Sequence, residues 1–391
     1  MLSDKTLRYG EELCAITLGI DHVYRKEINA GVNDPHEGLA VLNMGSVPSR
    51  EFASYEDARQ ALSDMAQKAF TLPEEDRRLY YTQACISLDS FCASRMGLLP
   101  SLTSQIGMFL HVNPAPISDA EIESLKQRIH IMLTQMGYSG DLMKQCADWE
   151  AKNRVPADEV KDVMEELMVE ARERTGRILD LPEGDYYGVV TQTGCSFNAS
   201  SHYDERSVII NIDPVLTKPS LKHLVCHECY PGHFMQFSLR QRLYEKGIAA
   251  ADGLLSVCNH SSSSTFEGIA DASMEFIDWV EDDNDRVMAL LGELRAALGT
   301  AASYQLHALK KHFSEVESWV RSNTLIGGEG WVASRMRFVD DSSRSALIWS
   351  YWRGDQGVFD VWRRVEPKDR PRFFDYIYDR LHTVQSMQLF R

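Results

Sequence analysis

Apolar residues recur three and four positions apart along most of the chain, which is the spacing of an amphipathic helix. The pattern covers these segments: 54–70, 74–96, 118–137, 157–179, 219–245, 262–281 and 284–310. Ser118 followed by Glu121 is the signature of a capping box, so one helix should begin there. The hydrophobic pattern therefore predicts a mainly α protein.

The pattern changes between residues 181 and 217. Tyr186–Val190 and Val208–Ile212 are short and rich in aromatic and β-branched residues, with small polar residues between them. These segments predict two strands, which form either one hairpin or part of a small sheet. We therefore expect a helical half over 1–180 and a second half over 181–391. No Pro/Gly/Ser-rich linker separates the halves, so the two should form one continuous unit.

Composition and charge narrow the function classes. The chain has 391 residues, of which 44% are apolar and 25% charged, as in an ordinary globular protein. It carries 57 acidic and 41 basic residues, a formal charge of −16, and its basic runs are short pairs such as Arg363-Arg364. Phosphate backbones repel such a surface, so nucleic-acid binding is not expected.

The cellular compartment is inferred from apolar stretches, the first residues and the cysteines. No stretch approaches the ~18 consecutive apolar residues of a membrane helix. The first residues lead to Glu11 and Glu12 rather than to an apolar signal core. The eight cysteines are scattered, which favours reduced core thiols over a disulfide framework. These features predict a cytoplasmic protein without a membrane partner.

One segment carries the chemistry of a zinc hydrolase. His227-Glu228 is followed by Pro231-Gly232-His233. Neutral imidazoles bind Zn²⁺, and a carboxylate beside the first ligand can take a proton from the water that the metal activates. Glu228 is therefore the candidate general base, and His227 and His233 are candidate ligands.

The spacing of the two histidines is unusual. In the common H-E-x-x-H motif they lie four residues apart on one helix face, whereas here they lie six apart. Six residues turn an ideal helix by about 600°, which separates the side chains. Pro231 cannot donate a helical hydrogen bond, and Gly232 tolerates unusual backbone angles, so a break can bring the rings back together.

The third ligand should follow in Thr265-Phe266-Glu267-Gly268-Ile269-Ala270-Asp271. Residues 261–265 can cap a helix that presents Glu267 in its first turns. Asp271 lies one turn further on the same face and could accept the second N–H of a ligating histidine. Glu275 could act in the same way or lie on a solvated face. Two histidines and Glu267 would leave one coordination position for water.

Cys226 and Cys229 allow another interpretation. A C-x-x-C pair with His227 and His233 could hold zinc in a closed structural site. A redox dithiol is less favoured, because the preceding residues do not read as a strand. The cysteines could also simply pack beside the site.

His227-Glu228-x-x-Pro231-Gly232-His233, followed by Phe266-Glu267-Gly268, resembles an uncharacterised bacterial family marked by H-E-x-x-P-G-H. That family is similar to gluzincin zinc peptidases such as the carboxypeptidase Taq and thimet oligopeptidase-like families. Residues 274–279 and 350–354 add to the resemblance, which covers roughly residues 185–385. It implies a helical zinc-peptidase-like fold with the small β element beside the active-site cleft.

The resemblance also implies roles for single residues. Glu228 would serve as general base and then acid, and a tyrosine hydroxyl would stabilise the oxyanion. Tyr351 matches the family's C-terminal element and is the first choice. His260, Tyr203 and His202 are the alternatives, as residues that bind substrate or support the site.

The sequence thus predicts a zinc metallohydrolase, most simply a peptidase acting on short peptides or amino-acid conjugates. Three alternatives remain: a zinc enzyme acting on a non-peptide small molecule, a degenerate relative that binds a ligand without turnover, and a structural-zinc interaction protein.

Overall fold

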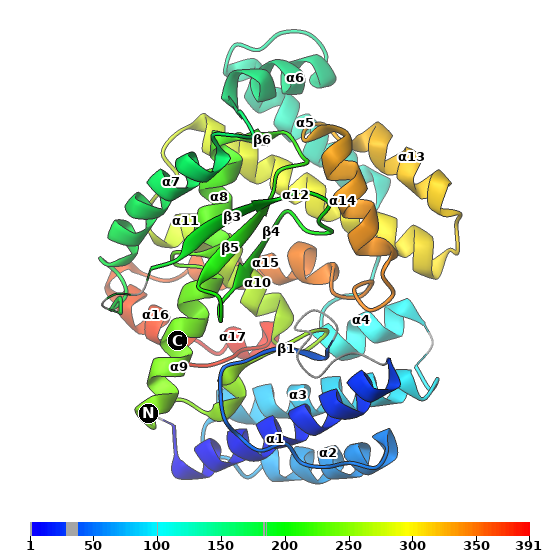
Figure 1. Cartoon of the computed structure of the whole chain (residues 1–391), viewed down its shortest axis with the longest axis vertical. Coiled ribbons are helices and arrows are strands. Elements are labelled where there is room, and N and C mark those ends of the chain that lie inside the picture. The colour runs from blue at the N-terminus through cyan, green and yellow to red at the C-terminus, as the bar shows by residue number, and fades with distance from the viewer. Residues whose placement is uncertain (1, 29–37, 100, 183, 185) are drawn as a thin grey trace. The chain divides into compact units, whose positions relative to one another are not determined.

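The computed structural model describes every residue except 1, 29–37, 100, 183 and 185. It confirms a mainly α protein with small sheets of two and three strands (Figure 1). The described chain forms two compact units that alternate along the sequence. Unit 1 comprises 1–114, 235–269 and 349–391, and unit 2 comprises 115–234 and 270–348. This division differs from the predicted halves, which mark the change from helices to strands near residue 180.

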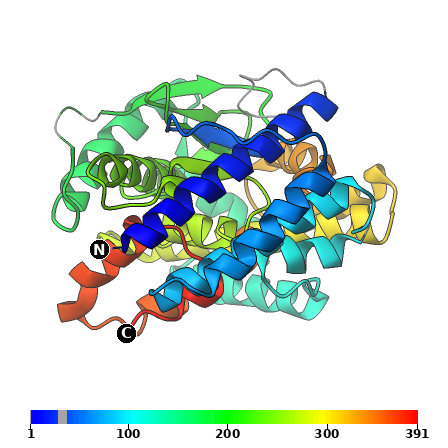
Figure 2. The ribbon, with the colours of Figure 1, turned by 90° about the horizontal axis from the view of Figure 1, so that it is seen from below.

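The helices and strands of unit 1 come from three parts of the chain. They are α1 Asp4–Glu27, β1 Ala40–Asn43, α2 Tyr55–Ala69, α3 Glu75–Arg95, α4 Leu102–Leu110, β7 Leu255–Val257, α15 Asp355–Trp362, α16 Arg370–Tyr378 and α17 Val384–Met387. Helix α1 packs on α2 and α3 (Figure 1, Figure 2). Strands β1 and β7 pair antiparallel. One core cluster of this unit contains Cys14, Leu18 and Leu254.

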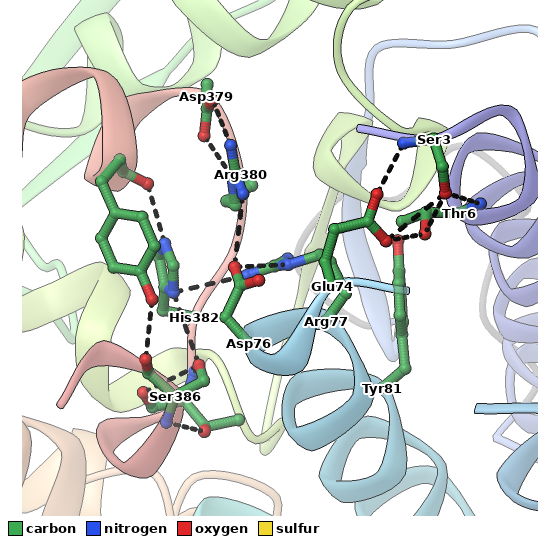
Figure 3. Close-up of polar contacts among 12 residues, drawn as sticks. Ser3, Thr6, Glu74, Asp76, Arg77, Tyr81, Asp379, Arg380, His382 and Ser386 are labelled. Carbon is green, nitrogen blue, oxygen red and sulfur yellow. Dashed lines mark hydrogen bonds and ion pairs between the residues drawn. The ribbon is translucent and has the colours of Figure 1, made fainter. Parts of the chain in front are cut away.

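A buried polar network holds the C-terminal segment of unit 1 against α3 (Figure 3). Asp76 Oδ2 accepts from Arg77 Nε at 3.0 Å and from Arg380 Nη1 at 3.3 Å. His382 Nε2 donates to the Tyr376 carbonyl at 2.8 Å, so its Nδ1 can face Arg77 Nη2 at 3.4 Å. Burial would raise the pKa of Asp76, but Arg77 and its neighbours outweigh it and lower that pKa to about 2.

Unit 2 contains the second group of helices and the larger sheet. Its elements are α5 Asp119–Gln135, α6 Leu142–Asn153, β2 Arg154–Val155, α7 Val160–Thr175, β3 Gly188–Gln192, β4 Ala199–His202, β5 Ser207–Asn211, β6 Leu216–Thr217, α8 Lys218–Glu228, α11 Ser273–Phe276, α12 Asp283–Ser303, α13 Phe313–Asn323 and α14 Gly328–Asp340. Helices α9 His233–Glu245 and α10 Ser263–Asp271 each contain a boundary between the units.

The three-stranded sheet of unit 2 has the order β3-β5-β4 (Figure 1). β3 and β5 pair in parallel, with Val190 opposite Ile209, and β4 pairs antiparallel with β5. The two segments predicted to be strands therefore belong to a small sheet and do not form a hairpin. The intervening β4, Ala-Ser-Ser-His, lacks the β-branched and aromatic residues that would have predicted it.

Local sequence signals account for several helix starts. The predicted capping box at Ser118 and Glu121 is present at the start of α5. Thr217 caps α8 with Ser220 in the same way, and Pro219 occupies the first turn, where its missing N–H costs no hydrogen bond. Among the described helices, none combines the length and apolar character needed to span a bilayer.

Candidate metal centre

Helix α8 carries the first candidate ligand in its last turn. It packs on α7, α11 and β4 within unit 2 (Figure 1). Lys222 anchors it, because its buried ammonium contacts Asp285 at 2.7 Å and Glu281 at 3.0 Å. His227 and Glu228 follow at the end of the helix, and both are buried.

The chain breaks between the two histidines of the expanded motif. Helix α8 ends at Glu228 and α9 begins at His233, with a cis Tyr230–Pro231 peptide between them. The His227 and His233 rings lie with centroids 4.6 Å apart and planes at 82°. A continuous helix would separate these side chains, so the break is what places the two imidazoles side by side.

Gly232 serves this junction for a different reason than expected. The sequence predicts an unusual backbone angle for it, but Gly232 does not have a positive φ. A Cβ at this position would instead overlap the carbonyl oxygens of His227 and Cys226. The glycine therefore permits the close approach of the chain to the end of α8.

Asp271 orients the first histidine. His227 Nδ1 donates to Asp271 Oδ1 at 2.7 Å, and His223 Nε2 lies 3.4 Å from the same oxygen. Because a carboxylate only accepts hydrogen bonds, Nδ1 of His227 carries the proton and its lone pair is on Nε2. This arrangement matches the carboxylate–histidine pair that commonly supports metal ligands.

Glu267 precedes Asp271 by one turn on the same helix, α10. Its side chain is nearly buried. Among the described residues, His227, His233 and Glu267 form one group whose ligand atoms lie within 4.8 Å of one another. His223, His227 and Asp271 form a second such group.

Burial and neighbouring charges shift the pKa values of acidic groups around His227. Burial opposes the ionisation of Asp271, but the adjacent His227 and His223 outweigh it and hold the Asp271 pKa well below its usual range. Burial raises the pKa of Tyr187, and the nearby carboxylate of Glu228 raises it further. Tyr187 stacks on Phe234 with centroids 4.3 Å apart, so an aromatic wall adjoins the ligand that precedes Phe234.

The two cysteines of the C-x-x-C pair pack as neutral thiols. Cys226 and Cys229 are free and buried, and burial raises the pKa of both. Neither belongs to the two groups of possible ligands found among the described residues. This geometry favours the packing interpretation over a closed Cys/His zinc site.

The other predicted residues lie outside these two ligand groups. Glu275 is exposed on α11, because the chain turns at Ala272 instead of continuing one helix over 262–281. His260 is buried, its Nδ1 is 2.9 Å from Ser262 Oγ, and burial lowers its pKa to about 3. His202 ends β4, Tyr203 follows it, and Tyr351 lies in the π-helical turn Ser350–Gly354.

His223 was not among the predicted site residues. A signal for it exists, because His223 and His227 have the four-residue spacing that places two histidines on one helix face. The neighbouring Pro-Gly motif, with its own pair of histidines, obscures this simpler pair in the sequence.

The comparisons with known proteins identify a fold. No family model and no curated protein matches the chain. It resembles the crystal structure of the "putative lipoprotein" from Colwellia psychrerythraea, with a TM-score of 0.56 and 12% identity, over 99% of this chain and 75% of that one. It also resembles a "putative lipoprotein of unknown function" from Shewanella oneidensis, with a TM-score of 0.50 and 12% identity, over 85% and 70%.

These findings correct two expectations. The assignment to the H-E-x-x-P-G-H family, and through it to gluzincin peptidases, is wrong, because no family model matches and the structural neighbours are described as lipoproteins. The expectation of a cytoplasmic protein is contradicted as well, because both structural neighbours are described as putative lipoproteins. The oxyanion role of Tyr351 was implied by that resemblance and stays a prediction.

Proposed function

We propose that the protein is a zinc-dependent hydrolase in which His227, His233 and Glu267 bind the metal and Glu228 is the general base. The observation that carries this proposal is the 4.6 Å approach of the His227 and His233 rings across the Pro-Gly break. Two imidazoles and a carboxylate are the donor set of open catalytic zinc sites, and the Asp271 carboxylate on His227 Nδ1 completes the fit.

Asp271, Glu228 and the metal ligands each have a separate role in this proposal. Asp271 keeps the His227 proton on Nδ1, so that Nε2 is the nitrogen available to the metal. When bound, zinc supplies Lewis-acid polarisation of a substrate carbonyl and lowers the pKa of water to roughly 7. Glu228, buried directly after His227, accepts the proton of the attacking water and delivers it to the leaving group.

The substrate class we propose is an amide bond in a short peptide or an amino-acid conjugate. A general acid next to the metal is needed most for amides, because an amine must be protonated as it leaves. Hydrolysis of a non-peptide small molecule by the same residues is the second candidate, since the donor set is equally suited to ester or other acyl bonds. A structural-zinc role for Cys226 and Cys229 is disfavoured by their absence from both described ligand groups.

The test uses zinc-loaded full-length protein and a library of dipeptides and N-acyl amino acids, with products detected by mass spectrometry. Glu228→Gln should keep zinc but lower kcat by about 10²–10⁴-fold, because the base is lost and the ligands are not. Glu275→Gln is the matched control, an exposed acid outside both ligand groups, and should keep full activity. Unchanged turnover in Glu228→Gln would refute the assignment of the base.

A further inference from the structure

The second ligand group lies within unit 2 and includes a residue to which the proposed hydrolase gives no role. His223, His227 and Asp271 offer one ligand atom each, all within 4.8 Å of one another. His223 and His227 lie on one face of α8, four residues apart, with ring centroids 5.7 Å apart. This helical spacing of two histidines is itself a common metal-chelating arrangement.

One of the two distances to the shared carboxylate suits a pair of metal ligands better than a hydrogen bond. Zinc–nitrogen distances are about 2.0–2.1 Å, so two ligands of one tetrahedral ion lie roughly 3.3 Å apart. His223 Nε2 is 3.4 Å from Asp271 Oδ1, which is long for a hydrogen bond and close to that separation. Only the His227–Asp271 contact, at 2.7 Å, would have to lengthen.

The second group is also accessible from solvent. The His223 side chain is 34% exposed, whereas that of His227 is 10% exposed. An ion could therefore bind His223 first, and the Asp271 carboxylate behind it would then complete the coordination.

We propose that His223, His227 and Asp271 form a second metal-binding position that competes with the His227/His233/Glu267 position for the His227 ring. It would take zinc or a similar divalent transition metal ion, with His223 Nε2, His227 Nδ1 and an Asp271 oxygen as ligands. This proposal goes beyond the hydrolase and does not depend on turnover.

The competition follows from the chemistry of imidazole. A neutral ring has one lone-pair nitrogen, and the other nitrogen carries the proton. At the first position His227 offers Nε2 and donates Nδ1–H to Asp271, whereas at the second it must offer Nδ1 and carry its proton on Nε2. A neutral ring serves one ion at a time, and two ions can share His227 only if the ring releases its proton to solvent and bridges them as an imidazolate. The first ion should therefore weaken the binding of the second, and the second that of the first.

Metal content alone does not report on the proposed catalytic position. A variant that lacks His233 has lost a ligand of the first position but keeps all three ligands of the second. For this reason the hydrolase is tested by the turnover of Glu228→Gln, which leaves both ligand groups intact.

The test measures zinc stoichiometry and affinity by equilibrium dialysis of the metal-free full-length protein, and ligand geometry by the absorption spectrum of bound Co²⁺. Wild type should bind one zinc tightly and a second at least tenfold more weakly. His223→Ala should lose the second equivalent and keep the first. His233→Ala should retain one equivalent, and adding His223→Ala should weaken that equivalent at least 100-fold.

The controls keep the outcomes separate. His22→Ala removes an exposed histidine of unit 1 that is in neither ligand group and should bind as wild type does. His223→Gln, which keeps the side-chain volume, replaces the alanine variant if that one does not fold. Equal zinc uptake by wild type and His223→Ala, or a His233→Ala variant that binds no zinc, would overturn the second position. Loss of all zinc in His223→Ala would instead refute the proposed catalytic position.

Discussion

His227 in unit 2 and His382 in unit 1 are both buried histidines with a carboxylate in their network, and they differ in what else surrounds them. Both ring nitrogens of His382 face protein groups, the Tyr376 carbonyl and the Arg77 guanidinium. Its network also contains Arg380, which together with Arg77 neutralises Asp76. His227 instead has His223, His233 and carboxylates as neighbours.

The difference shows which buried polar clusters can bind a metal. Arginine is always charged and has no lone pair to offer, so the Arg77 network repels a cation and its carboxylate is already paired. Imidazole nitrogens and carboxylate oxygens, in contrast, can coordinate a cation, and such atoms converge around His227. Neither of the ligand groups found among the described residues includes His382 or Asp76. We therefore interpret the His382 network as structural and the His227 cluster as a ligand site.

The largest expected effect comes from Gly232→Ala, which changes only the His227 cluster. The added Cβ would overlap the carbonyl oxygens of His227 and Cys226, which belong to backbone and cannot rotate away. We expect zinc affinity at the His227/His233 position to fall by at least about 100-fold, because one of its ligands is displaced. Isothermal titration of His223→Ala protein, with and without the glycine substitution, measures this position by itself.

The control for Gly232→Ala is a glycine without such a neighbour. Gly292 lies inside α12, and a Cβ there would meet no heavy atom within 4 Å. Gly292→Ala should keep zinc affinity and stabilise the fold by about 0.5–1 kcal/mol, as alanine does in a helix. A Gly232→Ala protein that binds zinc as tightly as Gly292→Ala would contradict the packing argument.

The next largest effect is a loss of stability that is confined to the His382 network. Arg77→Met removes a buried guanidinium whose side chain is 1% exposed and leaves Asp76 with less compensation. Breaking a buried ion pair from one side costs about 3–5 kcal/mol, so chemical denaturation should show a loss of that order. Zinc affinity should not change. Arg128→Met, which breaks an exposed pair with Glu293, should cost about 0–1 kcal/mol.

Asp271→Asn tests how much the negative charge beside His227 supports metal binding. An amide can still accept from His227 Nδ1, but it has no negative charge with which to support the ligand. We expect the first zinc equivalent to weaken by about 10–100-fold, as is typical for such supporting residues. The weaker second equivalent should disappear, because Asp271 is itself a ligand there. Dialysis at several zinc concentrations distinguishes the two losses, and equal weakening of both equivalents would argue against separate roles.

The parts of this structure that the sequence predicts depend on local signals. The Ser118–Glu121 capping box and the helical spacing identify the helices, and Pro231 marks the break that separates α8 from α9. The parallel pairing of β3 with β5 has no local signal, because side chains alternate between the two faces of a strand whichever direction its partner runs. The contact between Arg77 and His382 joins positions 305 residues apart, which no spacing rule relates.

The candidate site is likewise predictable where its signal is local and unpredictable where it depends on packing. His227, Glu228 and His233 stand in one short segment, and their residue types alone predict the chemistry. The partnership of His227 with Asp271 was predicted from helical spacing after Glu267, but the sharing of that carboxylate with His223 depends on how α8 and α10 pack. The resemblance to a peptidase family failed because it rested on a few short motifs, and no family model matches the chain.

The smallest expected effect is the pH dependence of the Arg77 network. The pKa of Asp76 is about 2 in the folded protein and 3.8 without its partners, so the folded state favours the charged form. Asp76 therefore stabilises the protein above about pH 4, and this contribution is lost as the pH falls from about 4 to about 2. Linkage converts this pKa difference into a contribution of about 2 kcal/mol. Asp76→Asn should flatten this part of the acid unfolding curve, whereas Asp148→Asn, which alters an exposed pair with Lys144, should leave it unchanged. Identical curves for Asp76→Asn and wild type would show that the arginines of this network do not need the charge of Asp76, and the contrast with His227 would then rest on packing alone.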